Sequence, residues 1–284
     1  RVVQGLIRFK LNSCDPLNQS IAFLGAGNMG EAMLRGLARA GMPAQRLHAF
    51  DPRQDHLKAL SADAGFTPHL LAAEAVAAAD LVVLATKPQG FAELLPSLAP
   101  LLRPGQAVLS IAAGVTLGRL QSSLGPSVPL IRVMPNTPGL IGQGASAYCL
   151  GAQATPQHAA LAEAVLAPLG LVLRVDEAQM DAVTALSGSG PAYVFLFMEA
   201  LQSAGEGLGL KPETAFALAS QTLAGAAAMI RQKAKTPAEL RVAVTSPGGT
   251  TAAALKVFED GDFRGLVARA LRAAGERSAE LGKG

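Results

Sequence analysis

Three glycines near the start of the chain have the spacing of a loop that binds phosphate groups. The motif reads GAGNMG and consists of Gly25, Ala26, Gly27, Asn28, Met29 and Gly30. In such a turn the first glycine permits a tight bend, the second lets a pyrophosphate approach the backbone, and the third lets the next helix pack closely on its strand. Amide groups at the start of that helix attract the anion. An apolar run at 21–24 precedes the motif and a helical pattern at 30–40 follows it, so the sequence predicts a dinucleotide-binding site.

The acidic residue Asp51 ends the second predicted strand, where dinucleotide-binding folds hold the adenosine ribose. Its carboxylate could bond the ribose 2′-hydroxyl and would repel a 2′-phosphate, which favours NADH. Arg53 follows Pro52 and could bind that phosphate instead, or it could be an exposed turn residue. We therefore expect Asp51, Pro52 and Arg53 to belong to the cofactor site, with NADPH or NADH as the cofactor.

Two further loops follow predicted strands and belong at the same edge of the sheet. Thr86, Lys87 and Pro88 come after the apolar run at 80–85, and Ala112 and Ala113 come after the run at 107–111. Ligands of doubly wound folds bind outside the carboxyl ends of the strands. Lys87 could contact a ribose or a phosphate there, or be a solvated loop lysine. The two alanines would let a cofactor lie against the backbone.

Two glycine-serine loops in the second half of the chain open predicted helices. One covers residues 187–190, and the other contains Ser246, Gly248, Gly249, Thr250 and Thr251. Amide groups and hydroxyls at a helix N-terminus suit a small carboxylate. Ordinary capping of the helix by serine and threonine is the alternative.

The elements that must position these residues follow from the apolar pattern. Strands are expected at 21–24, 47–50, 80–85, 107–111, 130–133, 146–150 and 171–175, with helices at 30–40, 57–64, 88–98 and 117–124. Such alternation predicts a parallel sheet with right-handed crossovers. Beyond residue 176 the patterns are helical, at 181–186, 192–205, 212–233, 237–244, 251–258 and 263–281. The sequence thus predicts an α/β fold, with a Rossmann-type doubly wound sheet at 20–176 followed by an all-α domain at 177–284.

The composition narrows the classes of function. Half of the 284 residues are apolar, and the net charge of +3 comes from scattered basic residues, so we expect no nucleic-acid partner. Two isolated cysteines and four histidines without ligand spacing predict neither a disulfide nor a metal site. No run of the sequence is apolar over the length that a membrane span needs. We expect a cytoplasmic protein whose residues 1–19 are a poorly ordered leader or an added extension.

Six motifs, in their order and spacing, resemble the pyrroline-5-carboxylate reductase family over residues 20–282. Besides GAGNMG they are TKPQ at 86–89, IAAGVT at 111–116, RVMPNTP at 132–138, SGSGPAYVF at 187–195 and VTSPGGTTAAAL at 244–255. The resemblance implies an oxidoreductase that transfers a hydride from NADPH or NADH to the C=N bond of 1-pyrroline-5-carboxylate. The product is L-proline, in the last step of its biosynthesis.

The resemblance also implies an arrangement of the site. The N-terminal domain would hold the cofactor, with Asn136 close to it, and the all-α dimerisation domain would build a homodimer or a higher oligomer. The substrate would bind where domains of two subunits meet. The Gly248–Thr251 loop would bind its carboxylate, together with Ser246, and the Thr251 hydroxyl would orient or protonate the imine nitrogen. Glu177 would lie close to the substrate.

Two other functions remain open at this point. One is a reductase for a different imine or for a β-hydroxy acid, as in related two-domain dehydrogenases. The other is a sensor that binds nucleotide without turnover. Loss of either glycine-serine loop would have favoured the sensor, and both loops are intact.

Overall fold

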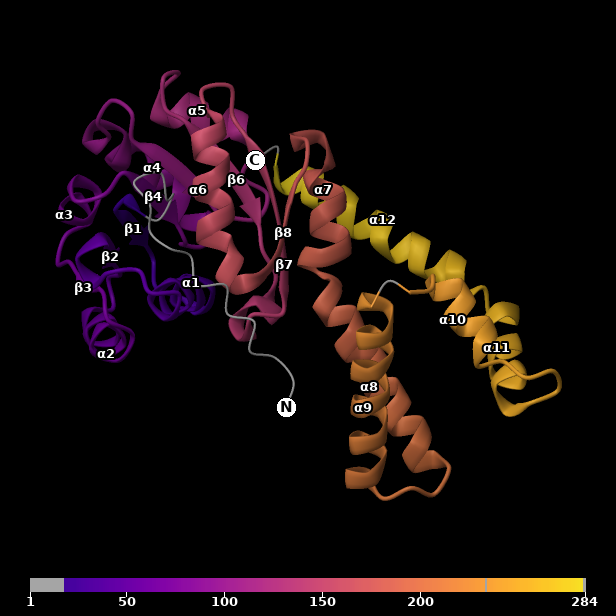
Figure 1. Ribbon diagram of the computed structural model, residues 1–284. Coiled ribbons are helices and arrows are strands. Elements are labelled where there is room, and N and C mark those ends of the chain that lie inside the picture. The colour runs from indigo at the N-terminus through magenta and orange to yellow at the C-terminus, as the bar shows by residue number, and fades with distance from the viewer. Residues whose placement is uncertain (1–17, 233, 283–284) are drawn as a thin grey trace. The chain divides into compact units, whose positions relative to one another are not determined.

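The computed structural model describes residues 18–232 and 234–282. The chain divides into two compact units (Figure 1). The sheet unit holds the described residues up to Gly188 together with those from Gly275, and the helical unit holds Ser189–Ala274. The predicted extension at 1–19 falls almost entirely outside the described residues. The predicted domain limit at residue 176 stays a prediction.

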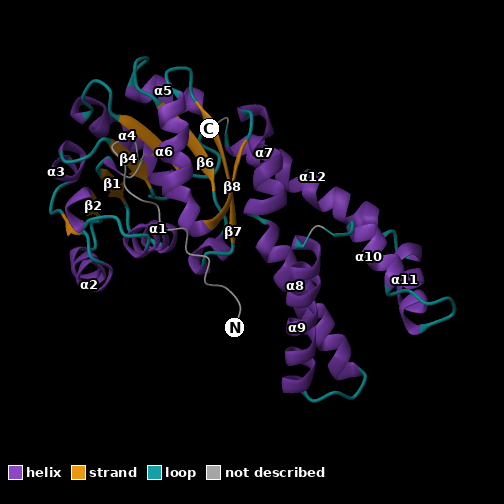
Figure 2. Cartoon of the chain, viewed as in Figure 1, coloured by secondary structure: helices purple, strands orange, loops and turns teal. Residues whose placement is uncertain are grey.

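An eight-stranded sheet forms the centre of the sheet unit, in the order β3-β2-β1-β4-β5-β6-β7-β8 (Figure 2). The strands are β1 Ile21–Leu24, β2 Leu47–Phe50, β3 Thr67–Pro68, β4 Leu81–Leu84, β5 Ala107–Ser110, β6 Leu130–Met134, β7 Gly144–Leu150 and β8 Gly170–Arg174. Neighbouring strands are parallel except β6 and β7. The predicted doubly wound, parallel sheet is confirmed, with the one antiparallel pair of β6 and β7 as an exception that the sequence did not predict. The connection from β6 to β7 is residues 135–143, which contain the short turn Thr137–Ile141, and a parallel pair needs a longer crossover.

Helices cover both faces of this sheet. They are α1 Asn28–Arg39, α2 Gln54–Ala64, α3 Ala72–Ala77, α4 Phe91–Leu98, α5 Leu117–Leu124, α6 Pro156–Leu166 and α7 Met180–Val183. Side chains of α1, α2 and α6 build one apolar core with one face of the sheet. Side chains of α3, α4 and α5 build a second core with the other face. The strands β1, β4 and β5 are buried along their whole length, which explains why their sequences are apolar without alternation.

The helical unit contains α8 Gly190–Gly207, α9 Pro212–Arg231, α10 Pro237–Ala243, α11 Thr250–Asp260 and most of α12 Phe263–Leu281. Prolines stand in the first turns of α8, α9 and α10, where a missing amide hydrogen costs nothing. Among the described residues of this unit only Ala215 is buried. None of the helices in the described parts of the chain has the length and apolar character needed to cross a bilayer.

Candidate cofactor and substrate sites

The glycine loop between β1 and α1 has the packing that its motif predicts. Gly25 has a φ angle of +106°, and a Cβ atom placed on it would lie 2.8 Å from the carbonyl group of Ala85. A Cβ on Gly30 would overlap the carbonyl oxygen of Gly25. Gly27, in contrast, has open space where its Cβ would stand. The outer glycines therefore let the helix and strands approach, while the middle one leaves room beside the backbone for a pyrophosphate.

The first turn of α1 can receive an anion. Gly27 is the N-cap residue, and no side chain in the described part of the chain caps this helix. The first helical hydrogen bond runs from the amide of Glu31 to the carbonyl oxygen of Gly27, over 2.7 Å. The amides of Asn28, Met29 and Gly30 precede that bond and can therefore donate to a phosphate.

Asp51 is held by the chain itself at the end of β2. Its Oδ2 accepts from the amide of Ala26 at 2.8 Å, and its Oδ1 accepts from the backbone amide and the Nε of Arg53, each at 2.9 Å. Burial acts to raise the pKa of Asp51, but the hydrogen bonds from Arg53 and Ala26 outweigh it and leave this pKa below its ordinary value. The Arg53 side chain remains 57% exposed. The carboxylate thus has its partners already, whereas the guanidinium lies at the rim beside exposed Pro52.

Thr86 carries an orphan hydroxyl next to the glycine loop. Its Oγ1 is buried and has no hydrogen-bond partner among the described residues. Its methyl group would lie 3.0 Å from a Cβ on Gly25. A buried hydroxyl without a partner is costly, so this position suits a bound group that supplies one. Lys87 and Pro88 follow, with the lysine exposed at the start of a short turn.

The loop after β5 carries Ala112, which is buried, and Ala113, which is exposed. Glu177 supports the helix that follows this loop. Its Oε1 accepts from the amide of Leu117, the first residue of α5, at 2.6 Å. The same oxygen lies 3.2 Å from Nη1 of Arg132, whose side chain is only 6% exposed. Glu177 therefore holds the start of α5 within the sheet unit.

Asn136 joins two of the motifs. Its Nδ2 donates to the carbonyl oxygen of Ser187 at 3.0 Å, and its Oδ1 accepts from the amide of Ala145 at 2.8 Å. Ser187 belongs to a π-helical turn, Thr184–Gly188. A Cβ on Gly188 would overlap the Cε of Met134, so the end of the Met134 side chain would have to move if a larger residue stood there. Both polar ends of the Asn136 amide are thus used to fix this turn.

The Gly248–Thr251 loop belongs to the helical unit, whereas the residues described above belong to the sheet unit. Gly248 has a φ angle of +72°, and the amide of Gly249 donates to the carbonyl oxygen of Ser246 at 3.0 Å. Gly249 is the N-cap of α11, and this helix also lacks a side-chain cap in the described residues. The amides of Thr250 and Thr251 therefore precede the first helical bond and can bind a carboxylate.

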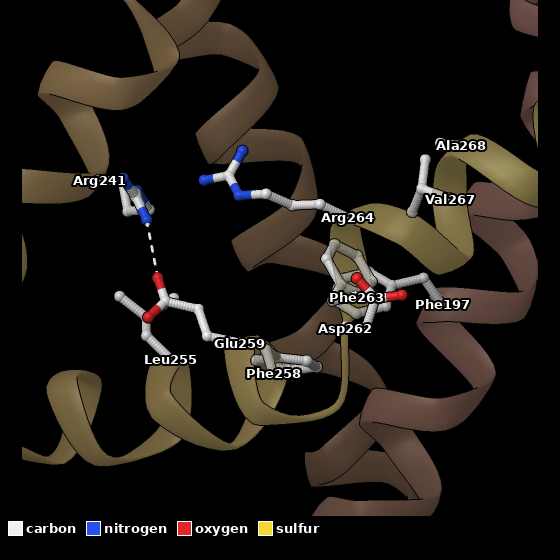
Figure 3. Close-up of a pocket in the computed structure, with 10 residues that line it drawn as sticks. All are labelled: Phe197, Arg241, Leu255, Phe258, Glu259, Asp262, Phe263, Arg264, Val267 and Ala268. Carbon is white, nitrogen blue, oxygen red and sulfur yellow. Dashed lines mark hydrogen bonds and ion pairs between the residues drawn. The ribbon is translucent and has the colours of Figure 1, made fainter.

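An apolar pocket of about 790 Å³ lies among α8, α10, α11 and α12 of the helical unit (Figure 3). Its apolar lining comes from Phe197, Leu255, Phe258, Phe263 and Val267. At its rim Nη1 of Arg241 lies 3.5 Å from Oε1 of Glu259. This pocket was not predicted from the sequence, because apolar residues at helical spacing predict a core equally well.

The doubly wound sheet, the glycine loop opening a helix, and the orphan hydroxyl beside it define a Rossmann-type dinucleotide-dependent oxidoreductase. Residues 20–114 match the family described as "NADP oxidoreductase coenzyme F420-dependent". This match confirms the prediction of a nicotinamide dinucleotide cofactor. Residues 177–281 match the family described as "Pyrroline-5-carboxylate reductase dimerisation".

The pyrroline-5-carboxylate reductase of Pseudomonas aeruginosa is 48% identical over 262 residues, which are 92% of this chain and 96% of that protein. The solved structure of the reductase from Coxiella burnetii superposes with a TM-score of 0.89 at 39% identity, covering 94% of this chain and 99% of that one. The reductase of Plasmodium falciparum, solved with NADP bound, gives a TM-score of 0.84 at 31% identity, covering 93% and 98%. The chain belongs to the pyrroline-5-carboxylate reductase family, as its motifs predicted.

Proposed function

We propose that the chain transfers a hydride from NADPH or NADH to the C=N bond of 1-pyrroline-5-carboxylate and releases L-proline. One observation carries this proposal: a chain of this family has both an open glycine loop before α1, which suits a pyrophosphate, and an uncapped start of α11, which suits a carboxylate. Activity on another imine or on a β-hydroxy acid, with none on this substrate, would overturn the proposal.

The proposed cofactor site lies at the carboxyl edge of the sheet. Its members are the predicted residues Gly25, Ala26, Gly27, Asn28, Met29, Gly30, Asp51, Pro52, Arg53, Thr86, Lys87, Pro88, Ala112 and Ala113. The amides that open α1 would bind the pyrophosphate, and the Thr86 hydroxyl would gain the partner that it lacks. Asn136 would support the cofactor site without contacting the cofactor through its amide, because both ends of that amide already bond the loops around Ser187 and Ala145. The bound cofactor supplies the hydride.

The proposed substrate site is the loop that opens α11. The amides that precede its first helical bond would hold the substrate carboxylate, with Ser246, Gly248 and Gly249 shaping the loop. The Thr251 hydroxyl would orient the ring nitrogen and keep a proton on it. An iminium carbon is already a strong electrophile, so the chain's task is to position the substrate and exclude water. Positioning can lower a barrier by roughly 7–11 kcal/mol.

We also propose that the enzyme works as a homodimer or a higher oligomer in the cytoplasm. A second copy would cover the apolar pocket of the helical unit, which agrees with the match of residues 177–281 to a dimerisation family. Burial and the charge of Glu177 raise the pKa of Cys149 to about 11, so this buried thiol stays protonated and unreactive. Cell fractionation would test the compartment.

The first experiment follows the loss of absorbance of NADPH and NADH with 1-pyrroline-5-carboxylate as substrate. We expect oxidation that depends on the imine, and a fall in kcat/KM of about 100-fold in Thr251→Ala. Thr222→Ala, on α9, is the matched control and should keep full activity. Absence of oxidation with both cofactors, in folded protein that binds nucleotide, would overturn the proposed reaction. Unchanged kcat and KM in Thr251→Ala would overturn only the role of that hydroxyl.

A further inference from the structure

The end of α12 packs against the part of the sheet unit that carries the loop after β5. Ser278 is 3% exposed, and its Oγ donates to Oδ1 of Asp181 on α7 at 2.7 Å. A Cβ on Gly275 would lie 3.9 Å from the Cβ of Ala185. Figure 1 shows this end of α12 beside α7. The last turns of the helix therefore belong to the sheet unit.

Small residues let this helix end touch the loop directly. Gly275, Ser278 and Gly282 have the spacing that places side chains on one face of a helix. A Cβ on Gly282 would lie 3.4 Å from the carbonyl oxygen of Gly114 and 3.4 Å from the Cγ2 of Thr116. Gly114 has a φ angle of +75°, and a Cβ on it would lie 3.0 Å from the Cβ of Leu281. The two segments thus lie close together, with a glycine on each side.

A buried arginine links this contact to the other support of the same loop. Arg132 lies 3.2 Å from the Glu177 oxygen that holds the first amide of α5. Its other terminal nitrogen lies 4.0 Å from the Asp181 oxygen that accepts from Ser278. The loop after β5 is therefore fixed at its far end by Glu177 and covered by the end of α12, and both supports meet at Arg132.

The topology places the nicotinamide end of the cofactor over this loop. The glycine loop after β1 would take the pyrophosphate, and the residues after β2 would take the adenosine. Because the sheet order continues from β1 to β4 and β5, the opposite end of the dinucleotide extends over the loops that follow those strands. This step rests on the proposed function.

We propose that Ser278 and Gly282 are positioning residues for the cofactor. They hold the loop at 112–116 in the form that binds the nicotinamide end. The end of the helix that closes the dimerisation region thereby takes part in nucleotide binding, in addition to any role in assembly.

Two variants and one control test the proposal in the full-length enzyme. Ser278→Ala removes the hydrogen bond to Asp181, and Gly282→Leu places a side chain against Gly114 and Thr116. Glu280→Leu is the control, because its side chain is 61% exposed and its ion pair with Arg277 lies at the surface. We expect the two variants to weaken binding of NADPH roughly threefold to tenfold, measured by nucleotide fluorescence. We expect no such change in the control.

A second readout needs no nucleotide. Hydrogen–deuterium exchange at the amides of residues 112–118 should be faster in both variants than in the wild type and the control. At saturating cofactor kcat should stay near the wild-type value, while the KM for the cofactor rises.

An unchanged dissociation constant together with a lower melting temperature would overturn the proposal, because the contact would then serve stability alone. Equal behaviour of Gly282→Leu and Glu280→Leu would overturn it as well. Failure of the wild-type enzyme to bind either nucleotide would instead contradict the proposed function.

Discussion

The pair formed by Asp51 and Arg53 bears on which cofactor the enzyme prefers. A free aspartate at this position favours NADH, but here both carboxylate oxygens accept hydrogen bonds from Ala26 and Arg53. These bonds use Nε and Nη2 of the guanidinium, which is held in place and remains exposed, and they leave Nη1 to donate to a 2′-phosphate. At this residue the structure therefore favours NADPH over the NADH that the bare sequence favoured.

We predict that Arg53→Ala lowers kcat/KM for NADPH about tenfold more than it lowers kcat/KM for NADH, as expected for loss of a charge-assisted bond. Steady-state kinetics with both cofactors and saturating imine measure the ratio. Lys58→Ala, an exposed residue of α2, is the control for a general loss of positive charge. An equal fall with both cofactors would mean that Arg53 holds the loop at Ala26 and does not recognise the phosphate.

The resemblance to the family implies that Glu177 lies close to the substrate. In the structure its carboxylate instead holds the first amide of α5 and pairs with Arg132. We predict that Glu177→Gln lowers the melting temperature, because it weakens the pairing of a buried arginine and the bond to the amide of Leu117. We also expect a higher KM for the cofactor and little change in the KM for the imine at saturating cofactor. A rise in the imine KM alone would favour the substrate contact.

At the scale of elements, the sequence predicted most of the sheet because its central strands are short apolar runs bounded by turns. It missed β3, which has two residues, the short helix α3, and α6, although Pro156 marks the start of α6. The loops of the candidate site were predicted because their glycines and hydroxyls have fixed spacing. The bonds of Asp51 to Ala26, of Asn136 to Ser187 and of Glu177 to Leu117 were not, since they join residues that are 25, 51 and 60 positions apart and are set by packing.

The pairing of β2 with β3 brings two histidines together at the edge of the sheet. His48, on β2, is 7% exposed, and its Nδ1 lies 3.1 Å from Nε2 of His69. Glu74 stands on the far side of His69, 3.9 Å from its Nδ1. Burial, and then the charge of His69, lowers the pKa of His48 below its ordinary value of 6.5.

The unfolded chain therefore takes up a proton on His48 at a higher pH than the folded chain does. We predict that the free energy of unfolding falls as the pH drops through about 6.5 and levels off below the folded pKa of His48. His48→Asn should flatten this dependence between about pH 7 and about pH 5, measured by urea unfolding. If the variant and the wild type lose stability in parallel over that range, His48 is not the group responsible.

At the scale of the whole molecule, the helical unit exposes a large apolar surface that we expect a second copy of the chain to cover. Its described residues bury only Ala215, while Phe195, Phe216 and Leu266 are each more than half exposed. A unit with so little interior cannot be stable through its own core. Covering the apolar pocket by another copy would supply the missing burial, so folding of this unit and assembly should be coupled.

We predict that Val267→Glu, in the lining of that pocket, dissociates the proposed homo-oligomer, because an unpaired charge in an apolar interface costs on the order of several kcal/mol. Light scattering after size-exclusion chromatography gives the mass, and circular dichroism shows whether the helices of this unit melt at a lower temperature. Arg272→Glu introduces the same side chain at an exposed position of α12 outside the pocket and should stay assembled. The sheet unit has cores of its own, so nucleotide binding should survive in Val267→Glu while turnover falls. A Val267→Glu protein that remains a fully active homo-oligomer would show that the second copy covers a different surface.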